Sequence, residues 1–167
     1  VVPLASGDYV VRSAAWHAPG GLANADAVTW CDGGSGCSGA VSATNSLVGA
    51  SAEDQVGGDV PLDFAQLSGV TELPNGNYVV VSYSWDSPGP IANAGAVTLC
   101  DGGVGCTGTI SAANSLVGTT ADDRVGFGVG APLADGNYVV LSPLWDAPGP
   151  IVNAGAATWC SGAAGCT

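Results

Sequence analysis

The chain of 167 residues contains no lysine and no methionine, and its only strongly basic side chains are those of Arg12 and Arg124. Fourteen acidic residues give it a formal charge of −12. Binding to nucleic acid depends on lysine and arginine contacts with phosphates, and anionic membrane surfaces attract clusters of the same residues. The scarcity of positive charge therefore argues against nucleic acid and an anionic membrane as partners.

Long hydrophobic runs are also absent. The apolar stretches are as short as Tyr78-Val79-Val80-Val81, whereas a membrane-spanning helix needs about 20 consecutive apolar residues. We therefore expect no membrane insertion. The sequence begins without an initiator methionine or a signal peptide, which favours either a processed mature protein or an excerpt of a longer one.

One unit of sequence occurs three times. Its best-matched part covers residues 7–37, 76–106 and 136–166. Such self-similarity is typical of repeat architectures. The sequence predicts repeat 1 over residues 1–57, repeat 2 over residues 58–126 with a nine-residue loop insertion, and repeat 3 over residues 127–167, truncated after its cysteine hairpin.

Each unit of about 60 residues is predicted to form a four-stranded antiparallel sheet. In repeat 2 the expected strands are residues 78–85, 96–100, 109–116 and about 124–129, because valine and aromatic residues lie between glycine- and proline-rich turns. Consecutive valines put apolar groups on both faces, which indicates sheets that are covered on both sides. The predicted fold is all-β, with tandem sheets arranged like β-propeller blades or as a linear stack.

Six cysteines form three pairs, each with five residues between its members. The pairs are Cys31 with Cys37, Cys100 with Cys106 and Cys160 with Cys166. Facing residues of an antiparallel hairpin are about 4.5–5.5 Å apart, which suits a disulfide. We therefore expect three local disulfides and an extracellular or cell-surface location, with pairing between repeats, metal-bound thiols and free thiols as alternatives.

The acidic and histidine residues offer little support for catalysis. Glu53-Asp54 and Asp122-Asp123 are adjacent in sequence, whereas the carboxylates of a glycosidase flank their substrate. We interpret them as turn residues that accept backbone N–H groups before the fourth strand. His17 replaces the aspartate of the other repeats and is interpreted as a loop substitution rather than a general base. The sequence thus predicts no enzyme.

Calcium is a secondary hypothesis. Asp86, Asp101 and Asp146 lie in predicted loops, and calcium prefers clustered oxygen ligands. However, Asp86 is replaced by His17 in repeat 1, and Asp101 is replaced by Ser161 in repeat 3. Because the ligand set changes between repeats, we expect no resident cofactor.

The tryptophans form two groups. Trp16, Trp85 and Trp145 end the first predicted strand of their repeats, and two interpretations remain open: packing, or contact with a glycan or protein. Trp30 and Trp159 lie in the middle of a predicted strand, which favours burial in the core.

The patterns GNYVV-x-S-x-x-W-D, NAGAVT and SAANSLVG followed by D-x-V-G resemble repeats in very large secreted bacterial surface proteins of the adhesin or haemagglutinin type. A weaker likeness is to the FG-GAP blades of integrin-like propellers, although the D-x-D-x-D-G calcium loop of those blades is replaced by LPNGNY and LADGNY. These resemblances imply a structural or adhesive role without an active site.

The missing second half of repeat 3 sharpens this expectation. A sheet without its third and fourth strands ends in an open edge, which recruits strands from other chains. We therefore expect a structural subunit or segment of an extracellular filament or adhesin shaft, which assembles head-to-tail with copies of itself or with further repeats of its own chain. The alternative is a carbohydrate- or protein-binding propeller-like module, assisted by calcium, that displays loops 17–25, 86–94 and 146–154.

Overall fold

The computed structural model describes residues 1–59, 69–89, 91–128, 130–149 and 151–166, which contain β-strands and no helix. The strands are β1 Val2–Pro3, β2 Tyr9–Ser13, β3 Ala27–Cys31, β4 Leu47–Val48, β5 Val70–Glu72, β6 Tyr78–Ser82, β7 Ala96–Cys100, β8 Gly108–Thr109, β9 Ser115–Val117, β10 Ala131–Pro132, β11 Tyr138–Ser142 and β12 Ala156–Cys160. No helix in these ranges could cross a membrane. The predicted insertion in repeat 2 falls largely on residues 60–68, outside the described residues.

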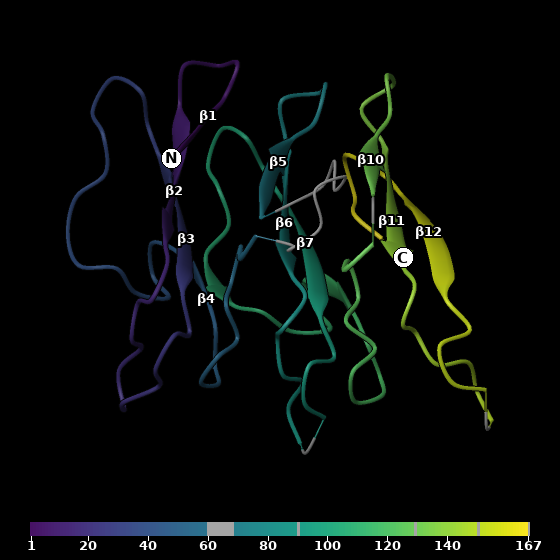
Figure 1. The fold of residues 1–167 in the computed structure, drawn as a ribbon. Coiled ribbons are helices and arrows are strands. Elements are labelled where there is room, and N and C mark those ends of the chain that lie inside the picture. Colours follow the sequence, from purple (N-terminus) through teal and green to yellow (C-terminus); the bar gives the residue numbers. More distant parts are fainter. Residues whose placement is uncertain (60–68, 90, 129, 150, 167) are drawn as a thin grey trace.

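The strands form three sheets that follow one another in a row (Figure 1). Sheet 1 has the order β1-β2-β3-β4-β8, sheet 2 the order β5-β6-β7-β9, and sheet 3 the order β10-β11-β12. The all-β repeat prediction is confirmed. Within the described part of the chain the sheets close into neither a barrel nor a propeller, so the linear stack is the arrangement found.

The same hairpin forms the centre of every sheet. Five-residue strands pair in equivalent register as β2 with β3, β6 with β7 and β11 with β12, so that Tyr78 faces Cys100 as Tyr138 faces Cys160. Valine, tyrosine and threonine favour these pleated, packed positions. The identical registers show that each repeat folds its central hairpin in the same way.

The hydrophobic core lies between neighbouring sheets rather than inside one sheet. Tyr78 and Val80 of β6 belong to the cluster shared with sheet 1, whereas Val79 and Val81 belong to the cluster shared with sheet 3. All four side chains are almost fully buried. Sheet 2 is therefore covered on both faces, as its consecutive valines predicted.

Three predicted strands differ in the structure. The first, 78–85, is shorter and ends at Ser82. The third, 109–116, is split: β8 joins sheet 1 and β9 joins sheet 2. The described part of the fourth, Arg124–Gly128, is not a strand, because Arg124 at φ 44° and Gly126 at φ 86° adopt left-handed backbone conformations. Each sheet instead begins with a strand of two or three residues, β1, β5 or β10, too short to stand out in the sequence.

One strand pair links two repeats. β8 belongs by sequence to repeat 2, but it pairs with β4 of repeat 1, with Leu47 opposite Gly108 and Val48 opposite Thr109. This pair is parallel, unlike the antiparallel sheets that were expected. The peptide N–H of Gly108 donates to the carbonyl oxygens of Ala43 and Ser46, at 2.8 and 3.1 Å. Repeat 2 is therefore joined to repeat 1 through the backbone as well as through side-chain packing.

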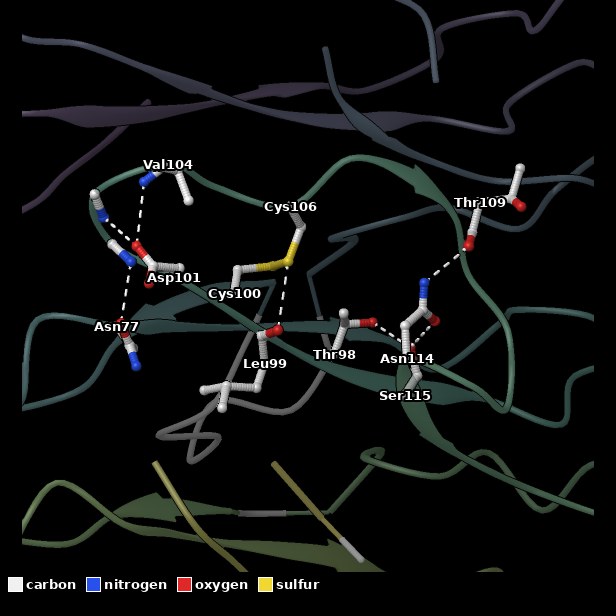
Figure 2. The surroundings of a disulfide bond; sticks show 12 residues. Asn77, Thr98, Leu99, Cys100, Asp101, Val104, Cys106, Thr109, Asn114 and Ser115 are labelled. Carbon is white, nitrogen blue, oxygen red and sulfur yellow. Dashed lines mark hydrogen bonds between the residues drawn. A yellow bond between two sulfur atoms is a disulfide. The ribbon is translucent and has the colours of Figure 1, made fainter. Parts of the chain in front are cut away.

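The three predicted local disulfides are present. Cys31–Cys37, Cys100–Cys106 and Cys160–Cys166 each close a turn next to the central hairpin, with Cα–Cα distances of 4.8, 5.1 and 4.3 Å. Figure 2 shows the second of them, where Asp101 Oδ1 accepts hydrogen bonds from the N–H groups of Gly103 and Val104 inside the closed turn. The described chain has no free cysteine.

Candidate functional site

The disulfide-closed turn of repeat 2 rests on sheet 1. Trp30 of β3 donates a hydrogen bond from Nε1 to the carbonyl oxygen of Gly102, at 2.8 Å. Gly105 lies so close to the Trp30 side chain that an added Cβ atom would collide with it. The Cys100–Cys106 turn therefore forms part of the contact between sheets 1 and 2.

The turn of repeat 3 makes the equivalent contact with repeat 2. The carbonyl oxygen of Gly162 accepts hydrogen bonds from the side-chain amides of Asn75 and Asn77, both at 2.8 Å. Gly165 lies over Leu99, which occupies the position of Trp30. The partner side chains differ between the two junctions, but the turn carbonyl is used in both.

A buried aspartate fixes each junction from the other end of the sheets. Asp54 Oδ1 accepts a hydrogen bond from the backbone N–H of Asp86 in the next repeat, and its Oδ2 accepts from the N–H groups of Ala50 and Ser51, at 2.7–2.9 Å. Asp123 binds the N–H groups of Thr119, Thr120 and Asp146 in the same way. The prediction that the acidic pairs accept backbone N–H groups is confirmed for Asp54 and Asp123, and one of the three donors to each comes from the neighbouring repeat. Their neighbours Glu53 and Asp122 instead accept hydrogen bonds from the side-chain amides of Asn24 and Asn93.

The environment of Asp54 suits a structural role. Burial raises the pKa of Asp54, although its hydrogen bonds with the Asp86, Ser51 and Ala50 backbone N–H groups oppose that change. The carboxylate is fully buried, and it accepts hydrogen bonds from three backbone N–H groups. A substrate could not reach this carboxylate without separating the two repeats. Its role is therefore to accept hydrogen bonds from the backbone N–H groups of both repeats.

The outer face of sheet 3 is the end of the stack. Its side chains Val139, Leu141, Ala157 and Trp159, which we name the end face, lie on one side because Val139 pairs with Trp159 and Leu141 with Ala157. Trp159 is 60% exposed. The prediction that Trp159 lies in the core is therefore wrong.

The physical reason is visible from the equivalent positions. Val28 and Val97, which correspond to Ala157, are each 1% exposed because the following sheet covers them. Trp30, which corresponds to Trp159, is packed against the core by the turn of repeat 2. Among the described residues no sheet follows sheet 3, and its tryptophan is left at the surface.

Two strands, β9 of sheet 2 and β12 of sheet 3, have an open edge. β12 is the last strand of sheet 3, whereas the equivalent strands β3 and β7 continue to β4 and β9. β9 is itself the last strand of sheet 2, whereas its equivalent β4 continues to β8. Within the described ranges these edges present backbone groups without a neighbouring strand, which is the arrangement that recruits further strands.

Trp16, Trp85 and Trp145, which each lie three residues after β2, β6 or β11 and not within these strands, differ in burial. Trp85 is 1% exposed and belongs to the core between sheets 1 and 2. Its ring is therefore covered by protein. Trp16 and Trp145 are half-buried. Contact with a glycan or protein stays a prediction for these two residues, while packing describes Trp85.

The candidate calcium ligands do not meet. Asp86 Oδ1 binds the backbone N–H of Asn93, Asp146 Oδ1 binds that of Asn153, and Asp101 closes its own turn. In the described ranges, no three His, Cys, Asp or Glu side chains gather as they would around a metal ion. His17 is exposed, and its position lacks the carboxylate that holds the loop in repeats 2 and 3.

Two features of the junctions were missed by sequence reasoning. The β4–β8 pair was hidden because Gly108–Thr109 reads as the start of one longer strand. The role of Asp54 and Asp123 between repeats could have been found from the recurrence of D-x-V-G in both complete repeats. The recurrence identifies the residue, but only the stacked sheets show which backbone it holds.

The comparisons with known proteins agree with this architecture. No curated protein and no solved structure matches the chain. The family model described as a repeat of unknown function (DUF5650) matches three times, over residues 3–58, 72–127 and 132–167. Each match covers the central hairpin and the cysteine turn of one sheet, so the chain belongs to the family of repeats of unknown function DUF5650.

Proposed function

We propose that this protein is a structural subunit or segment of an extracellular filament or adhesin shaft, in which copies of the repeat stack head-to-tail. The observation that carries the proposal is the end face. Four apolar side chains sit on the outer side of sheet 3, and the equivalent residues of sheet 2, Val79, Val81, Val97 and Leu99, pack in the core between sheets 2 and 3. Burying such a face is favourable by about 25 cal/mol per Å² of apolar surface.

The existing junctions define how the next copy would sit. Gly33 and Gly36 of repeat 1 correspond to Gly102 and Gly105 of repeat 2, and their turn is largely exposed. In a head-to-tail contact, Trp159 Nε1 would donate to the carbonyl oxygen of Gly33 of the next copy. Such a contact joins two different surfaces and continues indefinitely when it does not close. Repetition along one axis then gives a fibre.

The open edge of β12 adds a second element. Strand addition to a sheet edge supplies backbone hydrogen bonds without a particular side-chain chemistry. A neighbouring copy that covers the end face would therefore also be placed to extend sheet 3. The three disulfides support the extracellular setting, because such bonds persist in oxidising compartments.

The proposal is tested by self-association. Sedimentation velocity and electron microscopy across a concentration series should show filaments or ladders of oligomers for the native chain. Trp159→Ser should weaken the association about tenfold, since tryptophans in covered pockets dominate interfaces. Val104→Ser is the matched control, because Val104 is 72% exposed at the tip of a turn outside the end face. A chain that stays monomeric at every concentration would overturn the proposal.

A second candidate function is a carbohydrate- or protein-binding module. It is favoured by a hollow of about 190 Å³ in which half-buried Trp145 lies beside Thr119, Thr120 and Asp146. An aromatic ring next to hydroxyl and carboxylate groups suits a sugar. A glycan array would distinguish this function from assembly: the native chain should bind a glycan, and Trp145→Ala should lose that binding. A separate measurement with chelator tests whether calcium assists it.

A further inference from the structure

The cysteine turns of repeats 2 and 3 are held by different kinds of donor at their junctions with the preceding repeat. The carbonyl oxygen of Gly102 accepts a hydrogen bond from the indole N–H of Trp30. The equivalent carbonyl oxygen, that of Gly162, accepts hydrogen bonds from the side-chain amides of Asn75 and Asn77. The contact between repeats 2 and 3 at this carbonyl therefore depends on the chemical state of two amides.

The equivalent positions explain why the donors differ. Leu99 occupies the position of Trp30 and carries no donor group. Asp8 occupies the position of Asn77, and its carboxylate accepts a hydrogen bond from the cysteine turn of its own repeat but has none to donate. Asn77 does both, because its Oδ1 accepts the N–H of Gly102 at 3.1 Å (Figure 2) while its Nδ2 donates to the next repeat. An indole thus serves the first junction, and amides serve the second.

Asn75 is the only asparagine in the sequence that is followed by a glycine. An asparagine deamidates when the backbone nitrogen of the next residue attacks its Cγ atom, and Gly76 leaves that approach unhindered because it has no side chain. Asn75 lies in an exposed part of the turn before β6, where water reaches it. Asn77, in contrast, is followed by Tyr78, which is fully buried. The two amides at this junction therefore differ in reactivity.

The hydrogen bonds of the turn act on this reaction in two ways. The N–H of Asn77 donates to Asn75 Oδ1 at 3.1 Å, and negative charge develops on that oxygen when Cγ is attacked, so the bond stabilises the transition state. The N–H of Gly76 donates to the carbonyl oxygen of Leu73 at 2.9 Å, and this bond must open before the nitrogen can attack. Exposed turns open locally far more often than the whole fold. We therefore expect deamidation to be slower in the folded chain than in a free peptide, but not blocked.

Repeat 3 shows that the aspartate product fits the turn. Asp135 occupies the position of Asn75, and its Oδ1 accepts the N–H of Asn137 at 3.1 Å, just as Asn75 Oδ1 accepts that of Asn77. An aspartate at position 75 therefore keeps the contact within the turn. It loses the hydrogen bond to the carbonyl oxygen of Gly162, however, and places a second acceptor beside that oxygen, which leaves both without a donor between them.

We propose that Asn75 is a modification site, at which spontaneous deamidation loosens the junction between repeats 2 and 3 and leaves the junction between repeats 1 and 2 intact. The Gly76 nitrogen forms a bond to Asn75 Cγ, the bond from Cγ to the side-chain nitrogen breaks, and that nitrogen leaves as ammonia with the proton of the Gly76 N–H. One water then opens the resulting succinimide ring to aspartate or isoaspartate. The inference goes beyond the proposed function and does not depend on assembly, because both sides of the junction belong to one chain.

The reaction is tested by incubating the full, disulfide-intact chain in mildly alkaline buffer and mapping its peptides by mass spectrometry. Asn75 should convert to aspartate and isoaspartate at least about tenfold faster than Asn77 or Asn114, because only Asn75 precedes a residue without a Cβ atom. Asn75→Gln is the matched control, since it keeps a side-chain amide but would have to form a larger ring. Conversion of Asn75 no faster than that of Asn77, or an equal rate for the glutamine variant, would overturn the inference.

A variant measures the consequence for the fold. Asn75→Asp should lower the ratio of folded to unfolded chains about fivefold, the usual effect of losing one hydrogen bond. Asn153→Asp is the matched control, because it makes the same chemical change at an exposed loop residue outside the junction; its effect should be less than about twofold, as is usual for exposed charges. Denaturant titrations at high ionic strength, which screens the added charge, measure both variants. Equal effects would overturn the inference.

Hydrogen exchange locates the effect at one junction. The N–H groups of Gly105 and Gly165 close equivalent cysteine turns by donating to the carbonyl oxygens of Asp101 and Ser161, both at 2.8 Å. In Asn75→Asp, and in the deamidated chain separated by anion exchange, exchange at Gly165 should become about fivefold faster, by the same loss of one hydrogen bond. Exchange at Gly105 should stay unchanged, because Trp30 still holds that turn. Unchanged exchange at Gly165, or equal acceleration at both glycines, would overturn the inference.

Discussion

The indole N–H of Trp30 binds the carbonyl oxygen of Gly102 across 72 positions of sequence, at 2.8 Å. The bond joins the central hairpin of one repeat to the cysteine turn of the next. At the equivalent position of the last sheet, Trp159 is 60% exposed. Trp30 and Trp159 thus show that the same residue type makes a contact between repeats in one sheet and is exposed to solvent in another.

Trp30→Phe should destabilise the fold by about 1 kcal/mol, because it keeps the aromatic packing and removes one hydrogen bond. Trp159→Phe is the control, and it should change the free energy of unfolding by less than half as much because the ring is exposed. Equilibrium denaturation of monomeric samples measures both. Equal effects of the two substitutions would show that the Gly102 contact contributes nothing.

Gly102→Ala should destabilise the fold by roughly 1–3 kcal/mol, the usual cost of overpacking a tight position. A Cβ atom there would collide with the carbonyl oxygen of Gly76. Gly103→Ala is the matched control, since its Cβ would meet only the Asp101 side chain, at 3.4 Å, and repeat 3 carries Ala163 there. Thermal unfolding of the two variants should differ clearly; similar melting temperatures would contradict the predicted collision.

The Cys100–Cys106 disulfide should contribute about 2.4 kcal/mol to the free energy of unfolding, the chain-entropy value for so short a loop. The double variant Cys100→Ser with Cys106→Ser should lose this amount in a denaturant titration. The pair Cys160→Ser with Cys166→Ser closes a loop of the same length and should lose a similar amount. Alkylation of the intact native protein should label no cysteine, and labelling before reduction would show that the disulfides are not formed.

Asp26→Gly should stabilise the protein at neutral pH by about 1 kcal/mol. Asp26 is 6% exposed, its Oδ1 has no hydrogen-bond partner, and its φ of 58° is left-handed. Repeats 2 and 3 have Gly95 and Gly155 at this position, also with positive φ. The substitution removes an unsatisfied buried acceptor and backbone strain, which together exceed the entropic cost of adding a glycine.

The pH dependence gives a second readout for Asp26. Burial raises its pKa above the ordinary value of 3.8, with the nearby Glu53 charge adding to the effect, although backbone hydrogen bonds and Arg12 oppose it. The folded state therefore binds this proton more tightly than the unfolded state, and stability rises as the pH falls from the raised pKa toward 3.8. The Asp26→Gly variant should lack the share of this rise in stability at acidic pH that comes from Asp26. An unchanged slope between the native chain and the variant would contradict the assigned pKa direction.

Much of the fold could be predicted from the sequence because the repeat compares the chain with itself. Three aligned copies identified the cysteine turns, the central strands and their coverage on both faces. The described part of the predicted strand 124–129 was wrong because Val125 lies between left-handed positions at Arg124 and Gly126, and residue type alone does not report a positive φ at arginine. The strand 109–116 was split because its two ends satisfy the backbone groups of different sheets.

The candidate site was only half predictable. An open edge at repeat 3 was expected from its missing strands, and β12 is indeed the last strand of sheet 3 among the described residues. The exposure of Trp159 was not expected, since its strand resembles those that carry Trp30 and Leu99. A local pattern defines which face of a strand is apolar, but the presence of a neighbouring sheet determines whether that face is buried.

The sequence by itself determined the all-β repeat, the three disulfides and the register shared by the central hairpins, because turn glycines, β-branched residues and cysteine spacing act over short distances. Only the tertiary structure decided that the sheets stack in a line, that β8 crosses to the preceding sheet, and that Trp159 of the end face is exposed among the described residues. Those features depend on contacts between residues as much as 87 positions apart, such as Asn75 and Gly162, and no local pattern encodes which surfaces meet.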